Sequence, residues 1–216
     1  MIWVVDNFYK NPDKIREQAL KLDYVRGAGT NPPKVFHAGF RHTVQNDPNW
    51  WHNRIYLRNR VASISGLRPT DTSMKAMGAF NIGYAEKRNR YNWIHSDSNF
   101  GDDRGSSKMY AFVIYLTPNP PKNTGTLLFE DDKGNITNTY PSKKAMQEYE
   151  NPHFYGSFWD SDIDKDKWKV HCKVENRYNR LIMYDATYLH TSEDGGFGDT
   201  KETARLTQIG FWYGED

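Results

Sequence analysis

The sequence contains only one cysteine, Cys172, among its 216 residues. A single cysteine cannot form an internal disulfide, and it cannot supply the several thiolates of a cysteine-based zinc or iron–sulfur site. A metal site in this chain must therefore be built from histidine and carboxylate side chains. The near absence of cysteine also agrees with a reducing compartment.

Long apolar runs and a basic leader are missing as well. Apolar stretches such as residues 111–116 are far short of the about 20 residues that cross a bilayer. The chain starts with MIWVVD, which lacks the basic segment and the long apolar segment of a secretory signal. We therefore expect a cytoplasmic protein that has no membrane partner.

An excess of one charge sign is also missing, because 29 Lys and Arg residues stand against 27 Asp and Glu residues. No global electric field therefore attracts nucleic acid to this chain. Residues 50–60 and 87–93 mix basic and aromatic side chains, but a solvated helix face and a solvated loop are the favoured explanations. We expect no nucleic-acid partner.

Apolar and aromatic residues are plentiful enough for one packed core, at 37% and 15% of the chain. We predict a single domain over residues 1–216, in which residues 1–74 form an N-terminal strand and supporting helices. An apolar run at residues 2–5 indicates the strand. Asn11-Pro12 and Asp47-Pro48 are typical helix starts, and the helices they predict end near residue 22 and at Gly66.

From residue 75 onward, short apolar and aromatic runs predict strands. These strands are residues 79–84, 91–97, 109–116, 126–130, 169–174, 181–184, 188–191 and 205–213. Many short strands are typical of a barrel or a sandwich, so residues 75–213 form the predicted barrel core. Residues 142–167 combine a short helix with an aromatic, acidic loop that is longer than a barrel connection requires, and we predict an insertion that is either a substrate lid or merely structural.

His95 and Asp97 are candidate metal ligands. They lie two residues apart in a predicted strand, where alternating side chains place both on one face. Such a pair also arises by chance, and a surface histidine near a turn acid is the alternative. His190 ends another apolar run, and two histidines with one carboxylate would occupy one triangular face of an octahedral metal. Three positions would stay open, an arrangement that suits non-haem Fe(II).

Arg205 opens the last predicted strand, and Thr207 follows on the same face. In a barrel wall beside His190, the Arg205 guanidinium would lie in an apolar pocket, where an unpaired charge is unfavourable. Its partner would be either a protein carboxylate or a dicarboxylate ligand that accepts two hydrogen bonds from the planar guanidinium.

Five short motifs follow one another along the chain. They are His95-x-Asp97, YLT at residues 115–117, GTLLF at 125–129, NRLIMY at 179–184 leading to LHT at 189–191, and RLTQIGFW at 205–212. In this order they resemble the Fe(II)- and 2-oxoglutarate-dependent dioxygenases, most closely the prolyl-4-hydroxylase-like branch. The resemblance covers about residues 79–213.

The resemblance implies a fold class and a metal site. The fold would be mainly β with flanking α-helices, built around a double-stranded β-helix (jelly-roll, cupin-like) barrel. His95, Asp97 and His190 would bind Fe(II) near one mouth of the barrel.

The resemblance also implies a set of residues that bind 2-oxoglutarate as cosubstrate. Arg205 would pair with its distal carboxylate, and Thr207, Tyr115 and Tyr84 would be further cosubstrate-binding residues. Packing in the core is the alternative for both tyrosines. The spacing of fifteen residues between His190 and Arg205 is longer than in the closest branch, because residues 193–199 are inserted.

The implied activity is hydroxylation of an amino-acid, peptide or other small-molecule substrate by O2, with release of succinate and CO2. Related halogenases have a small apolar residue at the position of Asp97, so this carboxylate favours hydroxylation. The alternative is a cupin-type metal-dependent isomerase, or a non-catalytic metal- or small-molecule-binding protein without 2-oxoglutarate, either of which leaves Arg205 unexplained. We expect loops at residues 31–39, 99–107 and 151–166 to select the substrate.

Overall fold

The computed structural model of the chain describes residues 1–26, 40–42, 50–70, 77–85, 95–97, 107–130, 133–137, 169–193 and 196–216. The predicted insertion at residues 142–167 lies outside these ranges, as do the loops at residues 31–39 and 151–166 and nearly all of the loop at 99–107. No helix within the described ranges is long and apolar enough to cross a membrane.

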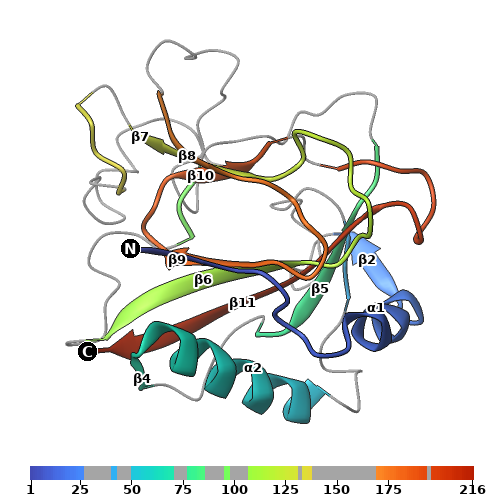
Figure 1. The fold of residues 1–216 in the computed structure, drawn as a ribbon, viewed down its shortest axis with the longest axis horizontal. Coiled ribbons are helices and arrows are strands. Elements are labelled where there is room, and N and C mark those ends of the chain that lie inside the picture. Colours follow the sequence, from blue (N-terminus) through green and yellow to red (C-terminus); the bar gives the residue numbers. More distant parts are fainter. Residues whose placement is uncertain are drawn as a thin grey trace.

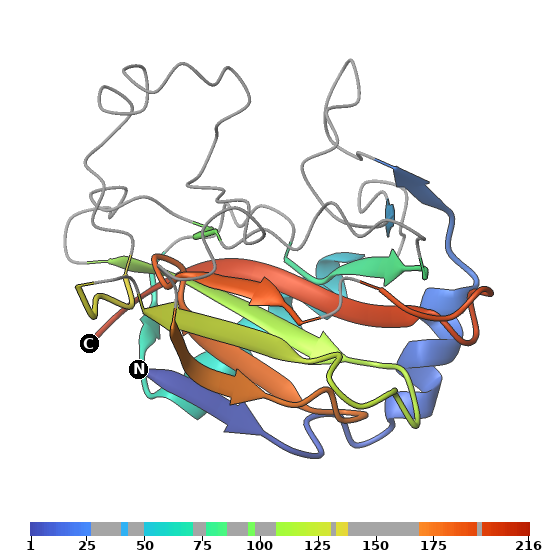
Figure 2. The ribbon, with the colours of Figure 1, turned by 90° about the horizontal axis from the view of Figure 1, so that it is seen from above.

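Two antiparallel sheets form the body of the molecule. The larger sheet has the order β1 (Ile2–Val5), β9 (Leu181–Asp185), β6 (Lys108–Tyr115), β11 (Arg205–Glu215), β5 (Ala79–Gly83), β3 (Phe40–His42) and β2 (Tyr24–Arg26), with β4 (Arg68–Pro69) also paired to β11. The smaller sheet has the order β10 (His190–Ser192), β7 (Thr126–Glu130) and β8 (Lys169–Val174). The smaller sheet faces the larger one (Figures 1 and 2). Facing antiparallel sheets with flanking helices confirm the predicted mainly β fold class.

Two helices flank the larger sheet, α1 (Pro12–Leu20) and α2 (Trp50–Ser65), and both were predicted. Asn11 caps α1, since its side-chain oxygen accepts a hydrogen bond from the backbone N–H of Lys14 at 3.2 Å. Pro12 occupies the first turn, where its missing N–H is not needed. The chain leaves α2 at Gly66, whose φ of 75° is a left-handed conformation that favours glycine.

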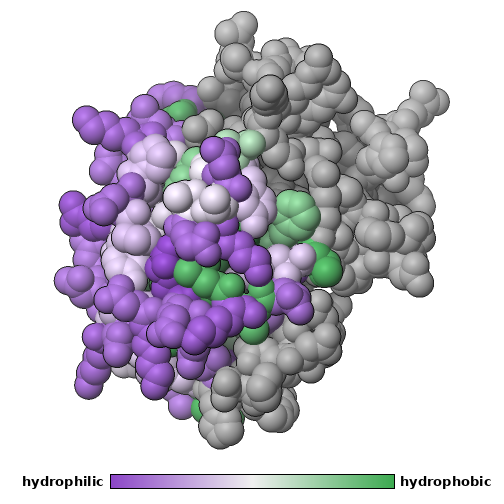
Figure 3. Space-filling view, turned by 90° about the vertical axis from the view of Figure 1, so that its right-hand side faces the viewer, coloured by the Kyte–Doolittle hydropathy of each residue, from purple (hydrophilic) through white to green (hydrophobic). Residues whose placement is uncertain are grey.

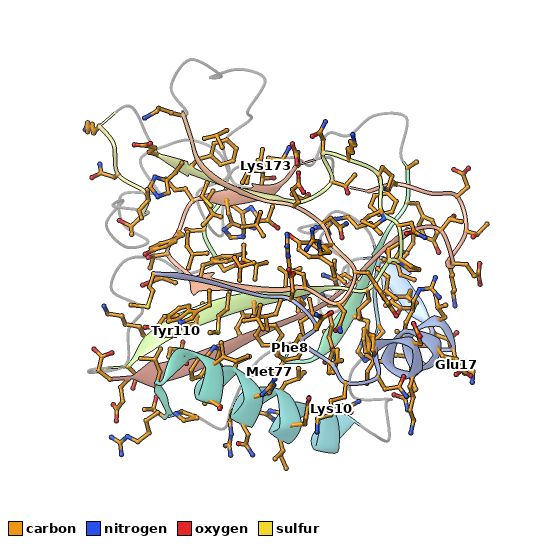
Figure 4. All side chains as sticks on the ribbon, viewed as in Figure 1. Phe8, Lys10, Glu17, Met77, Tyr110 and Lys173 are labelled. Carbon is orange, nitrogen blue, oxygen red and sulfur yellow. The ribbon has the colours of Figure 1, made fainter. Side chains whose placement is uncertain are left out.

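The face of the larger sheet toward the helices carries the main apolar core. Its buried members include Phe8, Leu57, Val61, Met77, Phe80, Ile82, Phe112, Ile114, Met183, Leu206 and Trp212. Figure 4 shows Phe8, Met77 and Tyr110 on the side of this sheet that α2 covers. Burial of this cluster holds the helices against the sheet.

The opposite face of the larger sheet packs against the smaller sheet. The buried apolar residues between the sheets are Ala111, Tyr115, Leu128, Val174, Ile182, Tyr184, Ala186 and Tyr188. The described surface in Figure 3 is mainly hydrophilic around a small hydrophobic cluster, because most apolar side chains are buried in these two cores. The space between the two sheets is the interior of the barrel, so a side chain on the inter-sheet face of a strand points into the barrel.

The strand predictions are confirmed without change for β1, β7 and β8, and within three residues at either end for β5, β6, β9, β10 and β11. The strands β2, β3 and β4 were not predicted, because two or three residues are too few to show an alternating pattern. Of the predicted strand at residues 91–97, only residues 95–97 are described, and they form an isolated bridge between His95 and His190.

Candidate metal centre

Backbone hydrogen bonds bring the segment of residues 95–97 to the start of β10. The N–H of His95 donates to the carbonyl of His190 at 2.9 Å, and the N–H of His190 donates back to His95 at 2.8 Å. The N–H of Asp97 donates to the carbonyl of Ala186 at 2.8 Å. The two imidazole rings consequently lie 4.3 Å apart between their centroids. The three candidate ligands thus meet, although His190 follows Asp97 by 93 residues in the sequence.

The ligand atoms of this group are close enough to share one metal ion. Asp97 Oδ1 lies 3.7 Å from His95 Nε2, and Asp97 Oδ2 lies 3.3 Å from His190 Nε2. One nitrogen or oxygen atom from each residue lies within 4.8 Å of the others. Neighbouring ligand atoms around an ion about 2.1 Å from each are about 3 Å apart, and the separations of 3.3 Å and 3.7 Å approach that value.

The protonation of His190 suits a metal ligand. Its Nδ1 lies 2.8 Å from the Tyr188 carbonyl oxygen, and because a carbonyl only accepts, Nδ1 carries a proton, which leaves Nε2 as the atom that can bind a metal. Burial acts to lower the pKa of His190, but the Asp97 carboxylate and the Tyr188 carbonyl raise it, and the net direction is upward. The buried Tyr184 ring, whose centroid lies 4.8 Å from that of the imidazole, excludes water from one side of His190.

Arg205 lies inside the barrel next to Tyr115. Its guanidinium carbon is 5.7 Å from the centre of the Tyr115 ring, and its Nε donates a long hydrogen bond of 3.5 Å to the Thr124 carbonyl. Burial lowers the pKa of Arg205, while Tyr115 and Tyr184 act in the opposite direction. No carboxylate of the described residues forms an ion pair with it.

Two of the remaining predicted residues join Arg205. Thr207 is 1% exposed and pairs with Tyr115 across β11 and β6, which places both side chains on the inter-sheet face. The Tyr115 hydroxyl lies 2.6 Å from Thr126 Oγ1. The structure therefore brings Arg205, Thr207 and Tyr115 together.

Tyr84 is placed elsewhere. It packs against the core between the helices and the larger sheet, and its ring lies 5.7 Å from the ring of Phe40. Along the strand, Gly83 pairs with Arg205, so the next side chain points to the opposite face. The expectation that Tyr84 binds the cosubstrate is corrected. Gly83 faces the barrel, so the Tyr84 side chain points to the other face of the sheet and packs in the core under the helices.

The profile of one protein family matches residues 1–212 of this chain, and that family is described as one of unknown function (DUF6445). The chain belongs to the DUF6445 family. No curated protein matches this DUF6445 chain in sequence.

Solved structures share the fold of this DUF6445 chain over 99% of its length. HygX from Streptomyces hygroscopicus, with nickel and 2-oxoglutarate bound, is 14% identical with a TM-score of 0.57 and is covered over 82% of its chain. A prolyl hydroxylase in complex with a hypoxia inducible factor peptide fragment, from Trichoplax adhaerens, is 13% identical with a TM-score of 0.52 and 83% coverage. SnoK, a non-haem α-ketoglutarate-dependent carbocyclase from nogalamycin biosynthesis, is 14% identical with a TM-score of 0.55 and 79% coverage. These likenesses confirm the predicted double-stranded β-helix fold.

Sequence reasoning missed two polar residues on the same inner face of this DUF6445 chain. Asn81 of β5 pairs with Thr207, and Arg41 of β3 pairs with Asn81. A three-residue strand such as β3 has no periodic signal, so nothing in the sequence placed Arg41 at the barrel. Thr126 belongs to the GTLLF motif at residues 125–129, but only the structure shows that its hydroxyl contacts the hydroxyl of Tyr115.

Proposed function

We propose that this protein is an Fe(II)- and 2-oxoglutarate-dependent dioxygenase of the prolyl-4-hydroxylase-like branch. It hydroxylates an amino-acid, peptide or other small-molecule substrate and converts 2-oxoglutarate and O2 into succinate and CO2. The observation that carries the proposal is the presence, inside one barrel, of the His95, Asp97 and His190 group and of the half-buried Arg205 side chain beside Tyr115. The fold shared with HygX and a prolyl hydroxylase supports it.

The residues divide into two sets with different tasks. His95, Asp97 and His190 hold Fe(II) through two neutral imidazoles and one carboxylate, a donor set that suits this ion and leaves positions open for other ligands. Arg205 pairs with the distal carboxylate of 2-oxoglutarate. When iron and 2-oxoglutarate are bound, they supply the activation of O2 that the side chains of a protein cannot provide.

The protein's own contribution is position, charge and exclusion of water. The Tyr188 carbonyl fixes the tautomer of His190, so that Nε2 faces the ion site. Arg205 is held beside Tyr115 in a buried wall, where its attraction for a carboxylate is stronger than in water. The carboxylate of Asp97 would be one of the metal ligands, and its presence favours hydroxylation.

The decisive experiment is an anaerobic titration of the protein with Fe(II) and 2-oxoglutarate, followed by visible absorption. A weak charge-transfer band is expected for the wild type, because the keto acid chelates the iron. Asp97→Ala should abolish the band by removing a metal ligand. A protein that binds the metal without producing the band would favour the cupin-type alternative and contradict the proposal.

The role of Arg205 is tested in the same titration. Arg205→Gln removes the cation that pairs with the cosubstrate, so the 2-oxoglutarate concentration at half-saturation should rise by about 10–100-fold while metal affinity stays unchanged. Arg68→Gln is the matched control, since Arg68 is exposed and pairs with Glu215 at the surface. An unchanged half-saturation in Arg205→Gln would place the cosubstrate anchor on another residue.

A further inference from the structure

A row of polar side chains crosses four neighbouring strands on the inner face of the larger sheet. The register pairs Arg41 with Asn81, Asn81 with Thr207, and Thr207 with Tyr115. Paired residues in antiparallel strands project to the same face. Since Tyr115 belongs to the core between the sheets, Arg41 and Asn81 extend that inner face toward the edge of the sheet.

The neighbours of Arg41 confirm this orientation. The Phe40 ring contacts Tyr84 edge to face and His42 packs against Phe80, and Tyr84 and Phe80 both belong to the helix side of the sheet. Because side chains alternate along β3, Arg41 points the other way, into the barrel. It is half-buried there, so it remains accessible to a ligand that enters the barrel.

Asn81 orients the guanidinium of Arg41. The Nε–H of Arg41 donates to Asn81 Oδ1 at 2.9 Å. The two terminal nitrogens of the guanidinium are the remaining donors, and none of the residues that the structure describes accepts a hydrogen bond from them. An oriented guanidinium with both terminal nitrogens available is suited to a carboxylate, which accepts two parallel hydrogen bonds.

Arg41 also lies within electrostatic reach of the metal-binding group. Burial lowers the pKa of Arg41, and the Asp97 carboxylate raises it. The register places the two arginines at different points of the inner face, since Arg205 of β11 pairs with Gly83 of β5 and Arg41 of β3 pairs with Asn81.

Within the described part of the chain, the charges at the loaded site do not balance without a further anion. A divalent ion and Arg205 carry three positive charges, and Asp97 and doubly charged 2-oxoglutarate carry three negative charges. Arg41 is then left with one positive charge in excess, and it forms no ion pair with any carboxylate in the described part of the chain. A partly buried, uncompensated charge is unfavourable, and a singly charged ligand removes the cost.

We infer that Arg41, oriented by Asn81, binds a carboxylate group of the substrate beside the metal centre. The inference rests on the proposed function, because the charge balance includes Fe(II) and 2-oxoglutarate. A carboxylate fits better than a phosphate, since one excess charge requires a singly charged partner. The substrate class is thereby narrowed to molecules that place one carboxylate in the site, such as a peptide with a free C-terminus whose amino group lies outside it.

The test starts from the anaerobic complex of the protein with Fe(II) and 2-oxoglutarate. The probes are acetate, the L-amino acids and a set of dipeptides, each compared with the corresponding amide, which lacks the carboxylate, and binding is followed by the shift of the charge-transfer band. For the wild type, at least one acid should bind at least about tenfold more tightly than its amide. Arg41→Gln should abolish this preference while its band with Fe(II) and 2-oxoglutarate stays unchanged.

Asn81→Asp provides a second and nearly isosteric variant. It supplies Arg41 with a carboxylate from the protein, so the preference for acids over amides should also disappear. Arg68→Gln, at an exposed ion pair, is the control and should keep the preference. Thermal unfolding of each variant verifies that the fold is intact.

The outcomes separate this inference from the proposed function. Absence of the band in the wild type contradicts the proposed function itself. A normal band with no acid preferred over its amide, or with a preference that survives in Arg41→Gln, overturns the inference alone. A half-saturation for 2-oxoglutarate that rises in Arg41→Gln assigns Arg41 to the cosubstrate and overturns it as well.

Discussion

Tyr115 connects the two sheets through one hydroxyl group. The residue is fully buried, and its hydroxyl lies 2.6 Å from Thr126 Oγ1 on β7 of the smaller sheet. Its ring also packs against the Arg205 guanidinium. A polar contact in such a dry place contributes to stability because neither hydroxyl has water as an alternative partner.

Tyr115→Phe should therefore destabilise the protein, because it leaves the Thr126 hydroxyl buried without this partner. The free energy of unfolding should fall by about 1–2 kcal/mol, measured by urea denaturation at neutral pH. Tyr56→Phe on the exposed face of α2 is the control and should change it by less than about 0.5 kcal/mol. If the effects of Tyr115→Phe and Thr126→Val simply add in the double variant, the two hydroxyls are not coupled.

At the scale of elements, the inserted segment before β11 leaves the position of Arg205 intact. The Phe197 N–H donates to the Gly83 carbonyl at 3.3 Å, and the Ala85 N–H donates to the Gly198 carbonyl at 2.9 Å. Gly196 lies so close to this strand end that a Cβ would be 2.4 Å from the Tyr84 carbonyl oxygen. The extra residues thus fold against the end of β5, and the long spacing from His190 does not displace Arg205 from the barrel.

Ion pairs link the connection between β1 and α1 to the turn before β9. Asp6 accepts hydrogen bonds from Arg180 Nε at 2.6 Å and Nη2 at 3.0 Å, and from Arg177 Nη1 at 3.1 Å. The hydrogen bonds from Arg180 contribute most to holding the pKa of Asp6 below its ordinary value of 3.8, and Arg177 adds to them. A carboxyl with a lowered pKa in the folded state stabilises the protein when it is ionised in both states.

The ion pairs of Asp6 with Arg177 and Arg180 should weaken in acid. The stabilisation by Asp6 is complete above about pH 5 and is lost as the pH falls through the lowered pKa of the folded state. Asp6→Asn should unfold more easily than the wild type at pH 6, by less than about 1 kcal/mol because the Asp6 side chain is 39% exposed. The difference should shrink at pH 3, as measured by urea denaturation at both pH values. A constant difference, or an equal response in the exposed control Asp23→Asn, would contradict this account.

At the scale of the whole molecule, the candidate site is built from residues of both sheets. His190 belongs to the smaller sheet, and Arg205 belongs to the larger sheet. A metal ion with 2-oxoglutarate would contact both sheets at once in the folded state, and the unfolded chain offers no such arrangement. Their binding should consequently raise the stability of the whole domain.

Ni(II), which avoids oxidation, together with 2-oxoglutarate should raise the melting temperature of the wild type by about 5–10 °C at a hundredfold excess over the dissociation constant. His190→Ala removes one ligand and should show little increase, and 2-oxoglutarate without the metal should have a smaller effect than both together. Scanning calorimetry measures these shifts. Equal shifts in His190→Ala and the wild type would mean that the metal binds elsewhere.

The sequence by itself determined the local elements. The bounds of β7 and β8 follow from apolar runs, and the start of α1 follows from Asn11-Pro12, because these signals lie within a few neighbouring residues. The order of motifs also singled out His95, Asp97, His190, Arg205, Thr207 and Tyr115, which the structure places in one barrel.

Only the tertiary structure decided which side chains face one another. Periodicity gives two opposite faces to a strand, but the strand pairing determines which face lies inside the barrel. For that reason Tyr84, which follows a correctly predicted strand, lies in the helix-side core, whereas Arg41 reaches the barrel from a strand too short to predict. Contacts between residues far apart in sequence depend on register, and no local pattern in this chain encodes the register of β3 against β5.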